Sequence, residues 1–376
     1  MKIREIHEFE SVKDDWNNIL QAYPINDNIF LTWEWLSAWW KHFHNGKRLL
    51  ILLLEENDQV QAIAPLMLSK IKLPFVGMIK KIEFLGTPHS DYHGFIVRKS
   101  EPETLRTVFR YLNDNFIDWD WIELMEVPES TQIPEFARRI IGEISNLKIK
   151  ERVCNLCPYL PLSPSFDLSQ TNMSGRSRRN LNRSYRKFRE KYTVNLQRYG
   201  EAGFSVEQAM KTFFALHQER WSMENSPGIF RTAREETMNF HMDVAHSFAE
   251  KDWLGTHFLM ANGEPVSALY SFEYNRRMFS YLTGFNPAYA DYSVGNLTIM
   301  LCLEKIAKRG FREFDFMRGI EAYKSHFTEK YRRNFQIRLV RRDLSAFFYD
   351  FISWNDVTNK MYNRLSRTKL SHESAS

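Results

Sequence analysis

The sequence has no apolar run long enough to cross a membrane as a helix. Its longest aliphatic stretch runs from Leu49 to Leu54 and is followed by two glutamates, whereas a spanning helix needs about 20 apolar residues. The first ten residues, MKIREIHEFE, are charged and lack the apolar centre of a secretory signal. We therefore expect a cytoplasmic protein.

Cysteine, glycine and proline are also scarce. Three cysteines in 376 residues fit a reducing compartment, and the single CxxC at Cys154 and Cys157 has no second pair to complete a zinc site. The 15 glycines and 13 prolines exclude a collagen-like or low-complexity chain. The motifs GxxxxGK[ST], GxGxxG and GxSxG are absent. We expect no metal, no P-loop and no hydrolase nucleophile elbow.

Aromatic residues and a regional excess of basic charge are present instead. The chain has 29 Phe, 16 Tyr and 10 Trp, and its length suggests two domains. Residues 1–150 carry 18 Lys and Arg against 22 Asp and Glu, and the remaining residues carry 33 against 24. The net charges of −4 and +9 place any phosphate-bearing partner on the second half.

Hydrophobic periodicity predicts the same series of elements twice. The first copy comprises helices from Ser11 and over 30–43, a hairpin over 48–68, strands at 80–86, 93–97 and 119–127, and a helix at 101–114. The second comprises helices over 205–222 and 231–250, a hairpin over 253–274, strands at 276–285 and 311–317, and a helix at 296–309. The order and the turn positions match although the identity is low. We infer two copies of one α/β unit.

A connector is expected between the copies at 150–172, because CPYLPLSPSF holds three prolines in ten residues. We place the first domain at 1–155, the second at 156–345, and a basic helical tail at 346–376. The tail offers a peripheral contact to the second domain or to a membrane surface.

Three segments of the second half carry polar groups suited to chemistry. The helix over 174–190 is rich in arginine, which fits either phosphate binding, through Arg179 and Arg183 among others, or a solvated helix covering a groove. A helix that begins at Ser293-Val294-Gly295-Asn296 exposes backbone N–H groups that suit a pyrophosphate, or it is capped for structural reasons alone.

The third segment is DFMRGIEAYKSHF, in which a strand delivers Asp315, Arg318-Gly319 turns the chain and further ionisable residues follow at once. Polar groups at this end of a strand commonly line an active site in α/β folds. His217, near the end of the 205–222 helix, is either a base or a packed, hydrogen-bonded side chain.

These motifs resemble those of GNAT-type acyltransferases of the CelD-like and FemAB-like branch. The resemblance rests on TWEWLSAWWKHF, SGRSRRNLNRSYRKF, LHQERW, the GEPVSA hairpin and YLTGFNPAYADYSVGNL followed by FDFMRGIEAYKSHF, in that order over residues 25–340. It implies two tandem GNAT-like domains of α/β (α+β) type, each a mixed, mostly antiparallel sheet flanked by helices. It also implies an acetyl-CoA or longer acyl-CoA donor in the second domain. The GNAT signature Q/R-x-x-G-x-G/A is reduced to Gly295.

The resemblance also assigns roles to individual residues. The helix start at 293–296 takes the pyrophosphate, and the strand at 277–284, with Thr283 and Gly284, supplies a backbone N–H to the oxyanion that develops on the thioester. Tyr323 takes the position of the tyrosine that protonates the leaving thiolate. The reaction also needs a base that takes the proton of the amine, and cationic groups that hold the CoA phosphate or an acidic acceptor. For the base we favour Asp315, with Glu273 and His217 as alternatives, and for the contacts Arg318 and Lys324.

The expected function is transfer of an acyl group from CoA to an amine of an amino sugar, an amino acid or a polysaccharide or cell-envelope precursor. One alternative is a FemAB-like transferase that uses aminoacyl-tRNA, in which the basic helix grips RNA. Another is a non-catalytic protein that binds RNA or another polyanion on a degenerate GNAT scaffold. Nucleic acid is a partner only under these alternatives.

Overall fold

The two predicted hairpins form where the sequence places them. A computed structural model describes residues 1–22, 27–73, 77–98, 101–114, 119–140, 147–222 and 234–341. Asn57 and Asp58 take left-handed φ values of 51° and 57° at the first hairpin turn, as a two-residue turn requires. Asn262 and Gly263 do the same in the second hairpin, with φ values of 52° and 87°. The Thr32 side chain accepts a hydrogen bond from Trp35 N and caps the tryptophan-rich helix.

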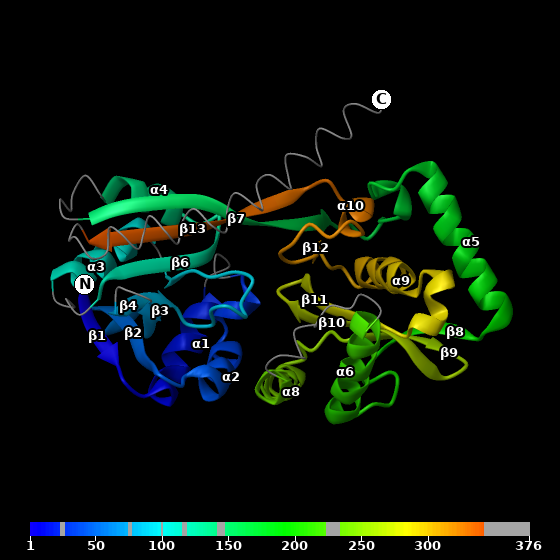
Figure 1. The fold of residues 1–376 in the computed structure, drawn as a ribbon, viewed down its shortest axis with the longest axis horizontal. Coiled ribbons are helices and arrows are strands. Elements are labelled where there is room, and N and C mark those ends of the chain that lie inside the picture. The colour runs from blue at the N-terminus through cyan, green and yellow to red at the C-terminus, as the bar shows by residue number, and fades with distance from the viewer. Residues whose placement is uncertain are drawn as a thin grey trace.

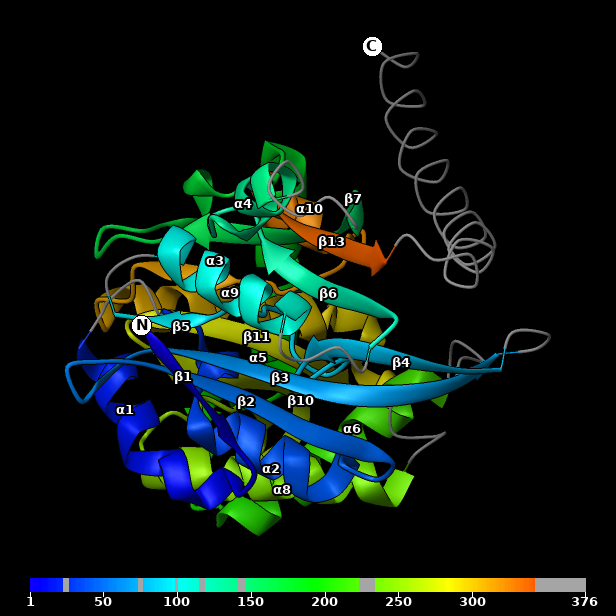
Figure 2. The same ribbon diagram turned by 90° about the vertical axis from the view of Figure 1, so that its left-hand side faces the viewer.

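The first half of the chain contains a sheet with helices on both faces (Figure 1). Its strands are β1 (Lys2–Ile6), β2 (Lys47–Glu56), β3 (Gln59–Leu73), β4 (Gly77–Phe84), β5 (Ile96–Val97), β6 (Trp121–Pro128) and β7 (Leu147–Pro161). Its helices are η1 (Phe9–Val12), α1 (Lys13–Ala22), η3 (Ile29–Leu31), α2 (Trp33–Phe43), α3 (Glu101–Asp114) and α4 (Ile133–Ile140). Figure 2 shows β1, β2, β3 and β4 side by side.

The second half repeats this order. Its strands are β8 (Val194–Arg198), β9 (His257–Ala261), β10 (Glu264–Tyr274), β11 (Arg277–Phe285), β12 (Glu313–Asp315) and β13 (Tyr331–Arg341). Its helices are η4 (Leu168–Gln170), α5 (Gly175–Lys191), α6 (Val206–Ser222), α8 (Arg234–Glu250), η5 (Pro287–Tyr292), α9 (Val294–Lys308) and α10 (Lys324–Phe327). Each half has one parallel pairing of three residues, Lys81–Glu83 with Trp121–Glu123 and Arg277–Phe279 with Glu313–Asp315. The predicted mixed, mostly antiparallel α/β fold is confirmed.

The two halves exchange their last strands, so one sheet runs through the molecule. β13 pairs with β6 of the first half, and β7 pairs with β12 of the second half and with β13. The expected connector at 150–172 is therefore wrong in its first part, because β7 is a strand from Leu147 to Pro161 and contains the expected domain boundary. Pro158 is tolerated where β7 changes partner from β13 to β12.

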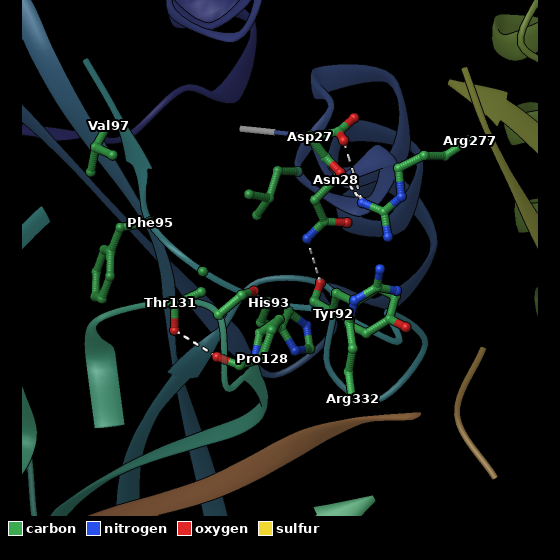
Figure 3. Close-up of a pocket in the computed structure, with 13 residues that line it drawn as sticks. Asp27, Asn28, Tyr92, His93, Phe95, Val97, Pro128, Thr131, Arg277 and Arg332 are labelled. Atoms are coloured by element: carbon green, nitrogen blue, oxygen red, sulfur yellow. Dashed lines mark hydrogen bonds and ion pairs between the residues drawn. The ribbon is translucent and has the colours of Figure 1, made fainter. Parts of the chain in front are cut away.

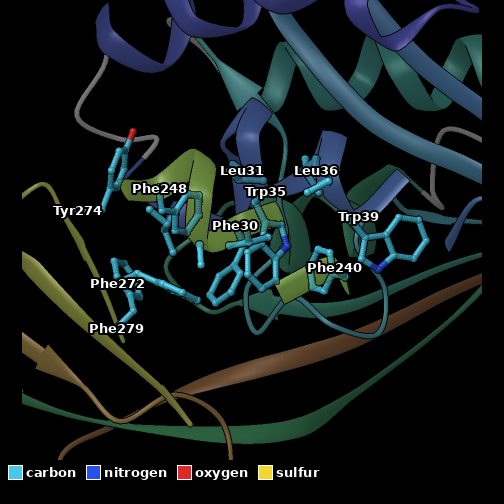
Figure 4. Close-up of a cluster of buried hydrophobic side chains, with 14 of the residues drawn as sticks. Phe30, Leu31, Trp35, Leu36, Trp39, Phe240, Phe248, Phe272, Tyr274 and Phe279 are labelled. Atoms are coloured by element: carbon cyan, nitrogen blue, oxygen red, sulfur yellow. The ribbon is translucent and has the colours of Figure 1, made fainter. Parts of the chain in front are cut away.

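A shared aromatic core joins the halves. Phe30 and Trp35 of the first half contact Phe272 of β10, with ring centroids 6.4 and 5.7 Å apart, and Trp35 also lies 5.1 Å from Phe240 of α8 (Figure 4). All four rings are fully buried. Much of the aromatic content therefore forms the contact between the halves, which fixes them relative to each other.

Two further expectations concern the C-terminal tail and a membrane-spanning helix. The predicted tail at 346–376 lies outside the described residues. No helix in the part of the chain that the structure describes is long and apolar enough to cross a membrane.

Candidate functional site

Strands β11 and β12 run parallel and then separate. They pair only over Arg277–Phe279 and Glu313–Asp315. Beyond β12 the backbone N–H of Phe316 donates to Pro158 O of β7 at 2.9 Å, so the chain follows β7 and leaves β11. β11 remains paired with β10 as far as Phe285. Residues 280–285 therefore have one edge without a strand partner in the described structure, which we call the open edge.

Thr283 presents its backbone to the open edge. The carbonyl of Gly284 points toward β10, where it accepts a hydrogen bond from Ser267 Oγ at 3.2 Å. Because successive residues of a strand direct their backbone groups to opposite edges, the N–H and C=O of Thr283 point the other way. The side chain of Arg220, in the last turn of α6, agrees with this direction, since it donates to Thr283 O at 3.4 Å and to Thr283 Oγ1.

Gly284 allows α6 to lie directly against β11. A Cβ atom at Gly284 would lie 2.4 Å from His217 N and 2.7 Å from Leu216 C, which are backbone atoms of α6. The His217 ring is buried, its Nε2 accepts from Trp221 Nε1 at 3.0 Å, and burial lowers its pKa to about 4. His217 is thus a neutral imidazole packed beside the open edge.

The start of α9 lies just beyond β11. Ser293 has a left-handed backbone, with φ of 56° and ψ of 40°, and its side chain does not cap the helix. The first helical bond is from Leu297 N to Ser293 O. The N–H groups of Val294, Gly295 and Asn296 find no hydrogen-bond acceptor among the described residues. Three unsatisfied N–H groups and the positive end of the helix dipole suit an anion.

Helix α5 extends from the start of α10 to the start of α9. At its N-terminal side, Asn172 Nδ2 donates to Ser325 O of α10 at 2.8 Å. At its C-terminal side, the Phe188 ring lies 4.9 Å from that of Tyr292 in η5. The predicted phosphate ligands Arg179 and Arg183 are exposed on α5 and form no ion pair with described residues.

Tyr323 immediately precedes α10 and is partly buried. Burial and the Glu321 carboxylate raise the pKa of its hydroxyl, and the charge of Arg220 opposes that rise. The hydroxyl is therefore protonated at neutral pH. Arg220 is therefore near enough for its charge to act on the Tyr323 hydroxyl, and it bonds to Thr283 at the open edge.

Asp315 does not fit its predicted role as the base. Its fully buried carboxylate accepts hydrogen bonds from Tyr92 Oη at 2.9 Å, Arg277 at 3.1 Å, Arg332 at 3.2 Å and Met317 N at 2.9 Å. Burial raises the pKa of Asp315, and the two guanidinium groups oppose that rise. With every oxygen engaged, Asp315 fixes the end of β12 to the first half.

Arg318 and Lys324 are also occupied by the protein itself rather than open to a ligand. Arg318 Nε contacts Asp91 at 3.1 Å and NH1 contacts Glu126 at 3.4 Å, both in the first half. The Asp91 carboxylate raises the pKa of Arg318. Lys324 Nζ is buried and donates to the carbonyl of Arg318 at 2.8 Å, which holds the loop that precedes it.

Glu273 lies at the wrong end of the second half for the predicted role of base. Its buried carboxylate forms a two-pronged ion pair with Arg309, with distances of 2.8 and 2.7 Å. Arg309 follows the last residue of α9, whereas the residues expected to bind phosphate start it. A helix of 15 residues is about 22 Å long, so Glu273 is remote from the open edge.

A separate cavity of about 230 Å³ lies between the halves at the other end of β11 (Figure 3). Asp27, Tyr92, Arg277 and Arg332 contribute its polar lining, and these groups also bond to one another or to Asp315. Thr283 lies six positions after Arg277, which is about 20 Å along a strand. Within the described ranges no group of three His, Cys, Asp or Glu side chains is arranged to hold a metal ion.

The site that emerges differs from the prediction in two ways. Thr283 and Gly284 lie on the open edge, the helix start at 293–296 lies just beyond it and Tyr323 lies within reach of the charge of Arg220, while the predicted carboxylates are engaged elsewhere. Arg220 was part of the LHQERW motif but received no role, because its contact with a strand 63 residues away is not visible in the sequence.

Comparison with known proteins agrees with this geometry. Residues 175–325 match the family of the acetyltransferase (GNAT) domain. No curated protein sequence matches the chain. The fold is similar to the crystal structure of FemX, with a TM-score of 0.61 and 12% identity over 94% of this chain and 100% of that chain.

Two further structures share the fold at low identity. The C-terminal domain of a putative lysylphosphatidylglycerol synthetase from Agrobacterium fabrum has a TM-score of 0.52 and 9% identity, over 92% of this chain and 95% of that one. A conserved protein of unknown function from Bacteroides thetaiotaomicron has a TM-score of 0.51 and 12% identity, over 90% and 100%. The matched segment contains α5, α6, β11, α9 and Tyr323. Residues 175–325 therefore match the GNAT acetyltransferase domain, within a fold that the chain shares with FemX over nearly its whole length.

Proposed function

We propose that the protein is an acyl-CoA-dependent N-acyltransferase whose donor lies along the open edge of β11. The observation that carries this proposal is the separation of β11 from the chain after β12, directly beside the unpaired N–H groups of residues 294–296. The separation offers backbone partners to an extended pantetheine arm. The helix start offers three donors to the pyrophosphate.

Phosphate binding extends from the helix start to α5. The exposed guanidinium groups of Arg179 and Arg183 have no ion-pair partner among the described residues. Guanidinium binds phosphate through two parallel hydrogen bonds. We assign these two side chains to the nucleotide end of the donor, outside the open edge.

The residues at the open edge fit the steps of acyl transfer. The Thr283 N–H donates to the thioester oxygen as negative charge develops there. The nitrogen of a neutral acceptor amine attacks the carbonyl carbon, the C–S bond breaks, and the Tyr323 hydroxyl protonates the leaving thiolate. The nitrogen loses a proton to water, and Tyr323 regains one from solvent. The products are an amide and free CoA.

Isothermal titration calorimetry tests the donor. Acetyl-CoA or a longer acyl-CoA should bind with a stoichiometry of one per chain, and Tyr323→Phe should bind the same donor equally well. If no acyl-CoA produces binding heat and aminoacyl-tRNA binds instead, the tRNA-dependent alternative replaces this proposal. The acceptor classes named above, an amino sugar, an amino acid or an envelope precursor, are separated by assaying release of the CoA thiol with each.

A further inference from the structure

Arg220 differs from Arg277, Arg318 and Arg332 in having no acidic partner among the described residues. Arg277 and Arg332 each contact Glu313 and Asp315, and Arg318 contacts Asp91 and Glu126. Arg220 is half-buried, yet its polar contacts with described residues are those of NH1 with Thr283. A partly buried cation without a counter-ion loses hydration, and an anion compensates that loss better than neutral acceptors do.

The surroundings of Arg220 hold its guanidinium in one orientation. Its Cζ lies 5.4 Å from the ring centroid of Trp221 and 5.7 Å from that of Phe285. The two bonds from NH1 to Thr283 fix one side of the group to the open edge. Nε and NH2 remain as two donors in one plane, which is the arrangement that binds a carboxylate or a phosphate.

Helix α6 packs on the face of the sheet opposite to α9, and the Arg220 guanidinium reaches past the open edge to Thr283 Oγ1 and the Phe285 ring. Side chains of α6 pack in the aromatic core shared by the two halves, whereas those of α9 pack in a separate core with Leu181 and Phe188 of α5. Arg220 therefore meets β11 at Thr283, where the thioester is placed, and not at residues 294–296, where the donor phosphates are placed. An anion bound by Arg220 lies beside the thioester, where the amine of the acceptor must approach.

We propose that Arg220 binds an anionic group of the acyl acceptor, so that the acceptor is an amine that also carries a carboxylate or a phosphate. This inference rests on the proposed acyl transfer. It makes Arg220 a specificity-determining residue: the guanidinium holds the anion and thereby aims the amine at the carbonyl beside Thr283.

Binding to the CoA-loaded protein tests the inference with matched pairs of amines. Glycine is compared with glycinamide for the carboxylate, and glucosamine 6-phosphate with glucosamine for the phosphate. One anionic member should bind and its neutral partner should bind more weakly. In Arg220→Gln the affinity for the anionic member should fall on the order of 10- to 100-fold, as expected for loss of a charged hydrogen-bonded pair. Arg220→Lys should retain part of it.

The control is Lys211→Gln, which removes the same charge from an exposed position of the same helix and should leave both affinities unchanged. The inference is overturned if the wild-type protein prefers neither anion or if Arg220→Gln binds both members of a pair as before. It is also overturned if Arg220→Gln loses affinity for acetyl-CoA, because Arg220 then serves the donor. Failure of the wild-type protein to bind any acyl-CoA contradicts the proposed function instead.

Discussion

The contact between α6 and β11 predicts the effect of a single added methyl group at Gly284. In Gly284→Ala the new Cβ would lie 2.4 Å from His217 N and 2.7 Å from both His217 Cα and Leu216 C. Because these are backbone atoms of a helix, no side-chain rotation relieves the clash. The backbone φ of Gly284 is not positive, so the cost comes from overpacking and is about 1–3 kcal/mol.

Urea unfolding measures this cost, and Gly295→Ala is the matched control. A Cβ at Gly295 would lie 3.6 Å from the Phe285 ring, an ordinary contact, so alanine should not destabilise the protein and should add up to about 1 kcal/mol of helix stability. Gly284→Ala should also lower acyl transfer, because displacement of α6 takes Arg220 away from Thr283. An unfolding midpoint of Gly284→Ala equal to that of the wild type would refute this account of the α6–β11 contact.

Three further predictions follow from individual groups. Tyr323→Phe should reduce kcat about 100-fold or more while the dissociation constant of acetyl-CoA stays constant, because the hydroxyl acts only on the leaving thiolate. A kcat equal to that of the wild type in steady-state assays would remove Tyr323 from the mechanism. Burial lowers the pKa values of His89 and His217 to about 4. Between about pH 6.5 and pH 4, both side chains are therefore neutral in the folded protein, whereas they bind protons in the unfolded chain. The free energy of unfolding should therefore fall as the pH drops from about 6.5 toward 4, and a constant value between pH 6.5 and 5 would contradict this. Arg318→Met should cost about 3–5 kcal/mol in urea unfolding, because it removes the cation between the buried carboxylates of Asp91 and Glu126. Arg333→Met, which breaks an exposed pair, should cost at most about 1 kcal/mol. Similar losses of stability in both variants would show that the buried pairs do not stabilise the junction.

Local signals in the sequence were sufficient for most elements of the fold. The hairpins over 48–68 and 253–274 are set by neighbouring residues, so they were predicted correctly. The exchange of β7 and β13 was not, because strand partners are chosen by contacts between residues about 180 positions apart. The prolines of β7 indicated a connector, but the structure places Pro158 where a missing N–H costs little.

The difference between local signals and long-range contacts also explains which site residues were predicted correctly. The helix start at 293–296 and the strand that contains Thr283 were recognisable from their local pattern. The role of Asp315 depends on Tyr92, which is 223 positions away, and that of Arg318 depends on Asp91 and Glu126. A sequence shows that such residues are ionisable but not that their partners already occupy them.

Hydrogen exchange with and without acetyl-CoA tests the central claim most directly. If the donor lies along the open edge with its pyrophosphate at the start of α9, the amides of residues 280–297, including Thr283 and Gly295, should exchange more slowly in its presence. The β2–β3 hairpin of the first half, residues 47–69, should be unaffected. Protection confined to the first half, or to the cavity around Asp27 and Tyr92, with none in 280–297, would contradict the account.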